Sequence, residues 1–296
     1  MPQSRARRGA YDHYRVVDAA PLLEWLLGNL EGYSRNKVKD VLQGRGIKVN
    51  GKTVTRFDHR LMAGDEVSVS LTKKNDRFRS RYVRLIYEDS RLVVIDKLPG
   101  VLSMPVGRSS VNVKSILDNY FRLMHRPYNA HVVHRLDRDT SGLMVYAKDM
   151  ETEQRFEHDW GRMVYDRRYV ALVSGEVTDE GGTISSWLKD DARFVTHSSS
   201  TDNGGKHAVT HFHTLERSAD RSLLEFRLDT GRKNQIRVHA AEIGHPVCGD
   251  NKYGNGDDPI HRLALHAYRL CFYHPFTRER MEFDTDIPPE FLKALR

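Results

Sequence analysis

Two acidic residues stand in a short charged stretch, HRLDRD at residues 134–139, between two apolar segments. Asp137 and Asp139 are two positions apart, and Arg135 and Arg138 accompany them. A pair of carboxyl groups can perform general acid and base catalysis when their environments separate their pKa values. The same acids could equally cap a turn or pair with the neighbouring arginines. The spacing alone therefore leaves catalysis open and does not choose between the two acids.

Histidine pairs are the second group of residues that could do chemistry. His131 and His134 are three positions apart, and His211 and His213 are two apart. On strands, the first pair would point to opposite faces of a sheet and the second pair to the same face. Neither spacing supplies a third ligand, and a basic chain with 15 histidines produces such pairs by chance. We therefore predict no metal site, and the absence of GxGxxG and GxxxxGK[ST] motifs predicts no nucleotide cofactor.

The segments around HRLDRD must position these side chains. Residues 130–133 and 143–147 are strand-like, so the charged stretch is expected to be a loop anchored on a sheet. From residue 82 onward most strand-like segments follow one another directly. This order predicts an α+β fold with a mixed, mainly antiparallel central sheet flanked by helices. Helices are expected at about residues 111–125, 153–163 and 233–244.

The positive charge of the chain is concentrated near its N-terminus. The net charge is +7, but residues 1–86 hold 18 Lys and Arg against 9 Asp and Glu, a surplus of +9. The remainder holds 29 against 31, or −2. Such asymmetry favours a polyanionic partner bound by an N-terminal module. We predict a basic disordered tail (residues 1–14), a small α+β domain (15–72), a linker (73–81) and a large domain (82–296).

The small domain has a recognisable order of elements. PLLEWLLGNL and SRNKVKDVLQGRG have apolar residues at helical spacing, IKVNGKTVT contains the hairpin signal Asn50-Gly51, and Gly64-Asp65 precedes the alternating EVSVSL. This order resembles the alpha-L RNA-binding domain, named after a ribosomal small-subunit protein. The resemblance implies structured RNA as the partner. The basic residues expected to contact RNA are Arg35, Lys37, Lys39, Arg45, Lys48 and Lys52.

Features that the sequence lacks indicate where in the cell the protein is expected. No run of about 18 apolar residues occurs, so no membrane-spanning helix is expected. The two cysteines, Cys248 and Cys271, form no CxxC motif, which fits a reducing cytoplasm. We expect a cytoplasmic protein and a monomer.

Several segments in order resemble the RluA-type pseudouridine synthases, which isomerise uridine in RNA. The resemblance spans roughly residues 82–285, and with the small domain in front it is similar to members that act on large-subunit ribosomal RNA. The matching segments are LIYEDSRLVVIDKLPG, HRLDRDTSGLMVYAKD, RRYVALVSG, LDTGRKNQIRVHAAEIGHPVCGDNKYG and LALHAYRLCFYHP.

The resemblance assigns roles to individual residues. It implies that Asp137, the D of HRLD, is the catalytic aspartate, that Tyr169 is the active-site tyrosine and that Arg237 pairs with the aspartate. It places Arg135 where it contacts RNA or braces the loop, and it gives Asp139 no catalytic role. One residue departs from the family pattern: Asn234 stands where the family often has histidine, and an amide cannot carry a positive charge.

The chemistry implied by this resemblance agrees with the missing cofactor motifs. Pseudouridine formation breaks the N1–C1′ bond of uridine, turns the uracil and rejoins it through C5, with no net oxidation or reduction. Large-subunit ribosomal RNA is the expected substrate. The alternatives are transfer RNA as the substrate, or a non-catalytic RNA-binding or ribosome-assembly factor.

Overall fold

The computed structural model describes residues 6–8, 11–30, 35–43, 46–69, 78–107 and 111–296. Its contacts divide the chain into two compact units, residues 1–79 with 85–89 and residues 80–84 with 90–296. Residues 85–89 overlap strand β8 (Val83–Glu88), which hydrogen-bonds to β9 in the sheet of the second unit. Among the residues that the structure describes, each helix is too short or too polar to cross a lipid bilayer.

The first unit is a small α+β structure. Its five-stranded sheet has the order β1-β2-β7-β4-β5, and β3 pairs separately with β6. The expected Asn50-Gly51 turn joins β4 to β5, and both residues have positive φ, as a type I′ hairpin requires. Its elements are β1 (Ala6–Arg8), β2 (Tyr11–Arg15), β3 (Ala20–Pro21), α1 (Leu22–Asn29), α2 (Arg35–Gln43), β4 (Ile47–Val49), β5 (Lys52–Thr53), β6 (Arg60–Leu61) and β7 (Glu66–Val69).

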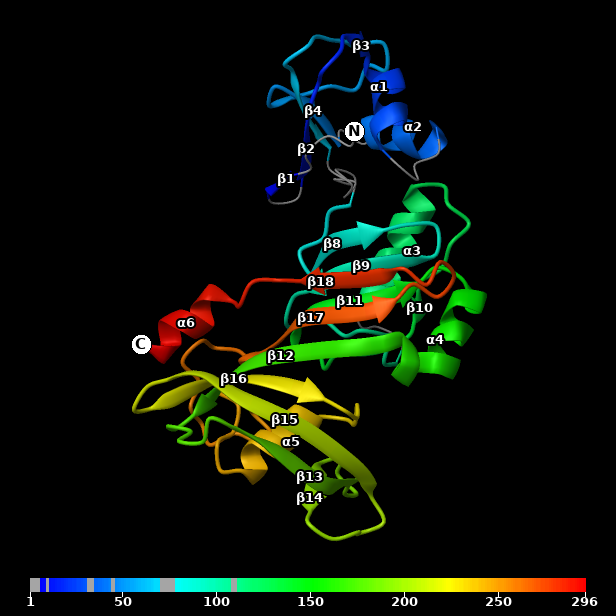
Figure 1. Ribbon diagram of the computed structural model, residues 1–296. Coiled ribbons are helices and arrows are strands. Elements are labelled where there is room, and N and C mark those ends of the chain that lie inside the picture. The colour runs from blue at the N-terminus through cyan, green and yellow to red at the C-terminus, as the bar shows by residue number, and fades with distance from the viewer. Residues whose placement is uncertain (1–5, 9–10, 31–34, 44–45, 70–77, 108–110) are drawn as a thin grey trace. The chain divides into compact units, whose positions relative to one another are not determined.

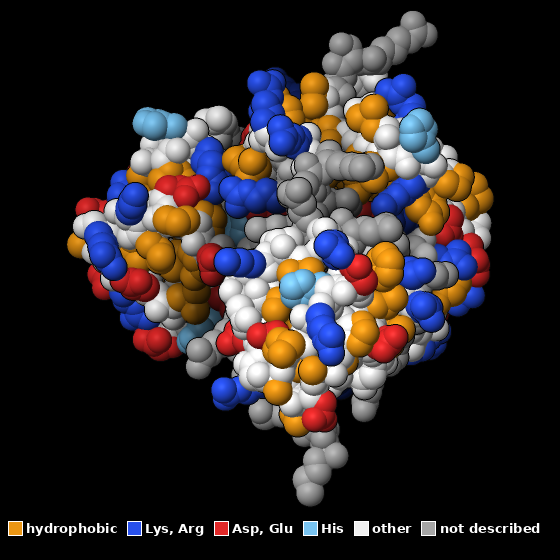
Figure 2. Space-filling view, turned by 90° about the horizontal axis from the view of Figure 1, so that it is seen from above, with side chains coloured by type: hydrophobic (Ala, Val, Ile, Leu, Met, Phe, Trp, Pro, Cys, Tyr) orange, Lys and Arg blue, Asp and Glu red, His pale blue; other side chains and the backbone are white. Residues whose placement is uncertain are grey.

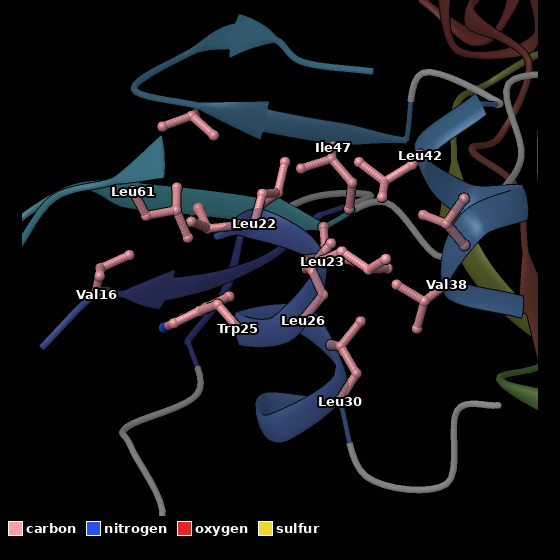
Figure 3. Close-up of a cluster of buried hydrophobic side chains, with 14 residues drawn as sticks. Val16, Leu22, Leu23, Trp25, Leu26, Leu30, Val38, Leu42, Ile47 and Leu61 are labelled. Carbon is pink, nitrogen blue, oxygen red and sulfur yellow. The ribbon is translucent and has the colours of Figure 1, made fainter. Parts of the chain in front are cut away.

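The core of the first unit lies between its helices and its sheet. Apolar residues of α1 and α2 recur at helical spacing and pack against alternate residues of β4 and β7 (Figure 3). Among them are Leu22, Leu26, Val38, Leu42 and Ile47. The hydrophobic pattern that predicts the two helices is therefore also what holds the unit together.

The disordered tail predicted for residues 1–14 is wrong at its C-terminal end. Residues 11–15 form β2, which pairs antiparallel with β7, for example Tyr14 with Val67. The ring of Tyr14 also lies edge-on to Trp25 in α1, with the ring centroids 6.0 Å apart. Polar composition suggested disorder, but the backbone hydrogen bonds and one aromatic contact incorporate this segment into the sheet.

The second unit is built around an eleven-stranded sheet. Nine strands follow the order β14-β13-β15-β16-β12-β17-β11-β9-β8, β10 pairs with β11, and β18 pairs with β17 (Figure 1). Most neighbouring strands are antiparallel, whereas β11 and β17 run parallel. The predicted α+β class, with a mixed and mainly antiparallel sheet, is confirmed. The strands are β8 (Val83–Glu88), β9 (Leu92–Lys97), β10 (His131–Val132), β11 (Ser141–Ala147), β12 (Val164–Ser174), β13 (Gly181–Asp190), β14 (Thr196–Ser199), β15 (Lys206–Arg217), β16 (Arg221–Leu228), β17 (Leu265–Tyr273) and β18 (Arg280–Asp284).

The helices of the second unit pack around this sheet. Two of them begin at a side-chain cap, because Asn112 accepts a hydrogen bond from the Ser115 N–H and Asp149 accepts one from the Thr152 N–H. Helix α5 packs on β14 and β15. The helices are α3 (Val113–Leu123), α4 (Met150–Met163), α5 (Gln235–Glu242) and α6 (Pro289–Leu295).

The centre of the sheet is a rigid frame for the HRLDRD loop. Every residue of β9 and of β11 is buried, as expected for strands covered on both faces. Gly142 lets β11 approach β17 closely, since a Cβ there would lie 2.2 Å from the Ala267 carbonyl oxygen. Residues 133–140 therefore connect two strands of a packed sheet.

Candidate active site

The backbone of the HRLDRD loop is fixed on both sides of Asp137. The Ser103 hydroxyl donates to the Leu136 carbonyl oxygen at 2.7 Å and accepts from the Leu136 N–H at 3.1 Å. The Lys97 ammonium donates to the Arg138 carbonyl oxygen at 2.8 Å, and the Gly100 N–H donates to the same oxygen at 3.0 Å. Backbone groups of both residues that neighbour Asp137, Leu136 and Arg138, are thus held by other segments of the chain.

Lys97 is a fully buried lysine at the end of β9. Its Nζ also donates to the carbonyl oxygens of Leu98 at 3.2 Å and Val101 at 3.0 Å, so three carbonyls surround the ammonium. Burial lowers the pKa of Lys97 to about 8, although the nearby charges of Asp139, Asp137 and Asp96 oppose this shift.

The lowered pKa of Lys97 makes stability depend on pH in a defined window. Between pH 8 and 10.5 the folded protein binds fewer protons at this residue than the unfolded chain, so its contribution to the free energy of unfolding rises with pH. We expect the unfolding free energy of the wild type, minus that of Lys97→Met, to rise by up to about 3 kcal/mol from the lower to the upper end of this window. Urea unfolding at several pH values measures the difference, and a flat difference would contradict the assignment.

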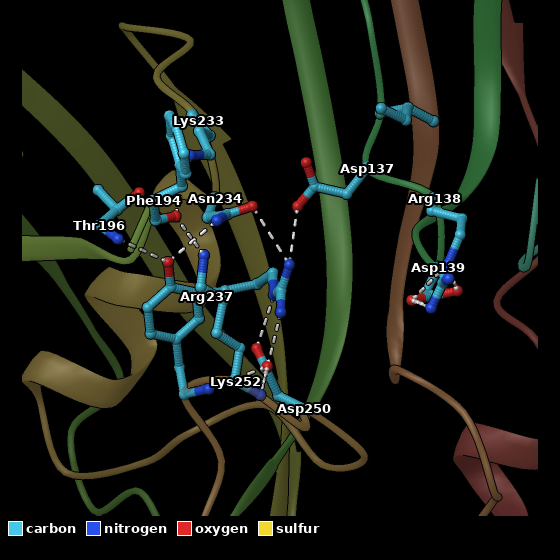
Figure 4. Close-up of polar contacts among 12 residues, drawn as sticks. Asp137, Arg138, Asp139, Phe194, Thr196, Lys233, Asn234, Arg237, Asp250 and Lys252 are labelled. Carbon is cyan, nitrogen blue, oxygen red and sulfur yellow. Dashed lines mark hydrogen bonds and ion pairs between the residues drawn. The ribbon is translucent and has the colours of Figure 1, made fainter. Parts of the chain in front are cut away.

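Arg237 on α5 contacts Asp137 and is itself held by a second acid. Its Nη1 donates to Asp137 Oδ2 at 3.1 Å, while Nε and Nη2 donate to the two oxygens of Asp250, each at 2.7 Å (Figure 4). The exposed fraction of the side chain is 24% for Asp137, 14% for Arg237 and 0% for Asp250. The bidentate pair fixes the plane of the guanidinium and directs its remaining edge at Asp137.

The charges of this triad reinforce one another. Burial alone would lower the pKa of Arg237, but its hydrogen bonds and ion pairs with Asp250 and Asp137 raise it overall. Burial would likewise raise the pKa of Asp250, and the Arg237 guanidinium and the N–H groups of Lys252 and Tyr253 lower it instead. Arg237 is therefore a permanent cation beside the Asp137 carboxylate.

Asn234, the position where the sequence resemblance led us to expect a histidine, joins the same network. It has a left-handed backbone (φ 55°) and stands at the N-cap of α5 without a side-chain hydrogen bond to the helix backbone. Its Oδ1 accepts from Arg237 Nη1 at 3.2 Å, and its Nδ2 donates to the Tyr253 hydroxyl at 3.0 Å. The amide thus links Arg237 and Tyr253 by hydrogen bonds, and it stays neutral because an amide does not titrate.

Tyr169 lies on β12 beside Asp137. It is 7% exposed, and burial raises its pKa, with the charge of Asp137 acting in the same direction. The phenol therefore stays protonated at neutral pH and remains a hydrogen-bond donor. The ring and the Asp137 carboxylate line one small pocket, and the site predicted from Asp137, Tyr169 and Arg237 does come together in space.

Asp137 lies where two pockets meet. The outer pocket has a volume of about 270 Å³ and the inner one of about 60 Å³. The inner pocket contains Tyr169, and the outer one contains the exposed apolar residues Met104 and Val106. The residues that line both are Arg135, Leu136, Asp137, Asn234 and Arg237. A ligand in either pocket would therefore lie beside Asp137.

The second acid of the motif, Asp139, lines the outer pocket only and pairs with a neighbouring arginine. Asp139 accepts two hydrogen bonds from Arg138 Nε, at 3.0 and 3.3 Å, and one from its Nη2 at 3.0 Å. Figure 4 shows this pair on the other side of the loop from the Arg237 guanidinium. Arg135 is exposed at the junction of the two pockets, which leaves its side chain available to a ligand.

The histidine pairs have structural partners. His131 Nδ1 lies 2.7 Å from Glu153, and His134 Nε2 accepts from the Val145 N–H at 3.0 Å. Burial lowers the pKa of His134 to about 3, so its ring is neutral. His211 contacts Asp229 at 2.8 Å. Among the described residues no three His, Cys, Asp or Glu side chains gather as a metal site would require.

The predicted RNA-binding residues of the first unit are described in part. Arg35 and Lys39 are exposed on α2, Lys52 is exposed on β5, and Lys48 is half-buried on β4. The side chain of Lys37, and Arg45 as a whole, lie outside the described residues. On the face shown in Figure 2, Lys and Arg side chains lie among acidic and hydrophobic ones.

Three residues of the site have no role in the sequence-based prediction. Asp250 lies in the GDNKYG segment, which the resemblance includes without a function, and Lys97 and Ser103 act on backbone atoms. An acidic residue shortly after a helix that bears an arginine could have indicated that Asp250 pairs with Arg237. Contacts with backbone atoms leave no such signal in the sequence.

Comparison with known proteins identifies the family of the chain. Residues 91–242 match the family model described as RNA pseudouridylate synthase. The chain is 34% identical over 272 residues to "Uncharacterized RNA pseudouridine synthase YjbO" of Bacillus subtilis (strain 168), covering 90% of this chain and 95% of the relative. It is 32% identical over 281 residues to "Ribosomal large subunit pseudouridine synthase D" of Escherichia coli (strain K12), covering 89% and 86%.

A solved structure confirms the fold. "Human RNA Pseudouridylate Synthase Domain Containing 1" aligns with a TM-score of 0.59 and 24% identity, covering 72% of this chain and 87% of the human one. The family match spans half of the chain, and the bacterial relatives exceed 30% identity over nearly all of it. The chain therefore belongs to the RNA pseudouridylate synthase family, in its RluA branch, and is an isomerase that acts on RNA.

Proposed function

We propose that this enzyme converts specific uridines of large-subunit ribosomal RNA to pseudouridine, with Asp137 as the essential group. One observation supports this role most strongly. Asp137 is the carboxylate that stands at the junction of the two pockets, on a loop whose backbone is held at Leu136 and Arg138, and in contact with the largely buried side chain of Arg237. A fixed, ionised carboxylate is what cleavage of a glycosidic bond at neutral pH requires.

The proposed reaction needs one group that can act as nucleophile or base. The N1–C1′ bond breaks, the C5–C1′ bond forms, and the proton lost from C5 passes to solvent while N1 gains one. Arg237 orients the Asp137 carboxylate through a charge-assisted hydrogen bond. The carboxylate acts by adding to the sugar, by adding to the base or by abstracting the C2′ proton, and all three routes require Asp137 in this place.

Tyr169 and the inner pocket serve the detached base in this proposal. The uracil must turn while it is held near C1′, which a small pocket with an aromatic wall permits. The Tyr169 ring stacks on the uracil or its hydroxyl takes part in proton transfer, and its raised pKa keeps that hydroxyl protonated. Tyr169 and Leu265 give this pocket a buried wall.

RNA must deliver its uridine to this site by extrusion. Flipping a stacked nucleotide costs about a few kcal/mol, which phosphate contacts can offset. We assign such contacts to the first unit, as an alpha-L domain, through Arg35, Lys37, Lys39, Arg45, Lys48 and Lys52, with Arg135 acting at the site. Phosphate contacts position RNA without reading its sequence, and their contribution falls as salt is added.

Large-subunit ribosomal RNA is the proposed target because the relatives named for that substrate are similar over both units. Pseudouridine mapping of total RNA, with and without the gene, tests it. Loss of pseudouridine from large-subunit RNA when the gene is absent supports the proposal. Loss from transfer RNA alone would show that transfer RNA is the substrate instead. If no site depends on the gene and the Asp137→Asn protein rescues a deletion strain, the protein acts as a binding factor instead.

A further inference from the structure

Phe194 is displayed to solvent on the loop between β13 and β14. Its exposed fraction is 72%, the largest among the exposed hydrophobic residues described. Its backbone φ is +61°, in the left-handed region that favours glycine and asparagine and is an outlier for a bulky side chain. Such strain costs about 1–3 kcal/mol and persists only where the surrounding structure imposes it.

The loop that carries Phe194 is firmly held. Asp191 Oδ1 accepts from the N–H groups of Arg193 at 2.8 Å and Val195 at 2.9 Å. The Asp191 backbone also bonds to Val195 and to Phe194, at 2.8 and 3.0 Å. An unconstrained surface phenylalanine would relax to an ordinary φ, so this hydrogen-bonded turn imposes the strained conformation and presents the ring outward.

Two lysines connect this loop to the candidate active site. The Phe194 carbonyl oxygen accepts from Lys252 Nζ at 2.7 Å and from Lys233 Nζ at 3.1 Å (Figure 4). Both lysines line the outer pocket together with Asp137. The Lys233 ammonium also lies 5.7 Å from the centroid of the Phe194 ring. The backbone that carries the exposed ring is therefore held beside the outer pocket by two lysines that line it together with Asp137.

We propose that Phe194 is a stacking platform for an unpaired base of the RNA, next to the uridine that enters the outer pocket. An exposed aromatic ring offers its face to any base, and cations beside it suit the phosphate that joins two nucleotides. An ammonium has three N–H donors. Lys252 donates to Phe194 and to the side chain of Tyr253, and Lys233 donates to Phe194 and Asp190, so each ammonium keeps one donor for that phosphate.

This assignment depends on RNA being the substrate, and not on which RNA it is or on the role of Asp137. Single exposed hydrophobic residues are common on protein surfaces and need no function. Phe194 differs from them because it is strained, rigid and anchored by pocket-lining lysines. The adjoining pocket also contains cations, namely Lys189, Lys206, Arg232 and Lys233 against one carboxylate, Asp190, which suits a continuing RNA strand.

The test uses the full chain and a fluorescein-labelled single-stranded nonamer of uridine at low ionic strength. Phe194→Gly removes the ring but suits the left-handed backbone and retains both carbonyl contacts. We expect it to weaken binding by about 5- to 100-fold, the range found for loss of one base–aromatic stack. Phe194→Tyr should bind like the wild type, whereas Phe194→Leu, apolar without a ring, should bind as weakly as Phe194→Gly.

Stability and a matched surface control complete the test. Leu215→Ala removes another exposed apolar side chain, on β15, and should leave binding unchanged. Phe194→Gly should unfold at the same temperature as the wild type or a higher one, since backbone strain is relieved. Wild-type affinity in Phe194→Leu, or a lower unfolding temperature in Phe194→Gly, would overturn the proposal. Turnover does not enter these measurements, so failure of the Asp137 assignment would leave them unaffected.

Discussion

Replacing Asp137 with asparagine is expected to lower turnover by at least about 10⁴-fold, below the detection limit of most assays. Asparagine keeps the size of the side chain, and its oxygen still accepts from Arg237 Nη1. It has no negative charge, so it can neither attack the sugar or base nor abstract a proton. The turnover number at saturating RNA is the measurement, because this change removes chemistry and not binding.

RNA affinity and stability are the controls for Asp137→Asn. Arg237 keeps its bidentate partner Asp250, so the arginine is not left as an uncompensated buried charge. The free energy of unfolding should therefore change by only about 1 kcal/mol. RNA affinity should stay within a few-fold of the wild type. Turnover within about tenfold of the wild type would contradict the role given to Asp137.

The second large effect is expected at Asp250, a residue that touches no substrate in this account. Asp250→Asn removes the negative charge that holds Arg237, and one amide N–H group then faces the guanidinium. We expect the free energy of unfolding to fall by about 3 kcal/mol, since a buried ion pair loses one partner. Turnover should fall by about 10- to 100-fold with a small change in KM, because Arg237 no longer orients Asp137.

Asp257 provides the matched control for Asp250. It also accepts two hydrogen bonds from an arginine, Arg221, at 2.8 and 2.9 Å, but it lines neither the outer nor the inner pocket. Asp257→Asn should lower the unfolding free energy and leave turnover unchanged. Thermal unfolding and steady-state kinetics on both variants separate the two roles. Equal losses of turnover in both would show that Asp250 acts only through stability.

Much of the fold follows from local patterns in the sequence. The apolar runs of β9 and β11 predict buried strands, the Asn50-Gly51 pair predicts the β4–β5 turn, and helical spacing predicts α1 and α2. Strand β2 escapes prediction because its residues are polar and its stability comes from hydrogen bonds to β7, far along the chain. The short strands β14 and β18 and helix α6 carry weak local signals and are set by their neighbours.

The candidate site divides in the same way. Asp137 and Arg237 are 100 residues apart, so neither spacing nor periodicity brings them together, and the family resemblance alone selects Asp137 over Asp139. The structure adds a physical reason for that choice, since Asp139 pairs with its neighbour Arg138 and lines only the outer pocket, whereas Asp137 lines both pockets and contacts Arg237. The contacts of Lys97 and Ser103 with the loop backbone depend on tertiary folding and leave no pattern of residue types.

The role of Asp137 is tested most directly by release of tritium from RNA that contains 5-tritiated uridine, under single-turnover conditions. The comparison pairs Asp137→Asn with Asp139→Asn, which change the same type of side chain two positions apart in one loop. We predict no release above background for Asp137→Asn and a rate within about tenfold of the wild type for Asp139→Asn. Equal loss in the two folded proteins, or wild-type release by Asp137→Asn, would contradict the account.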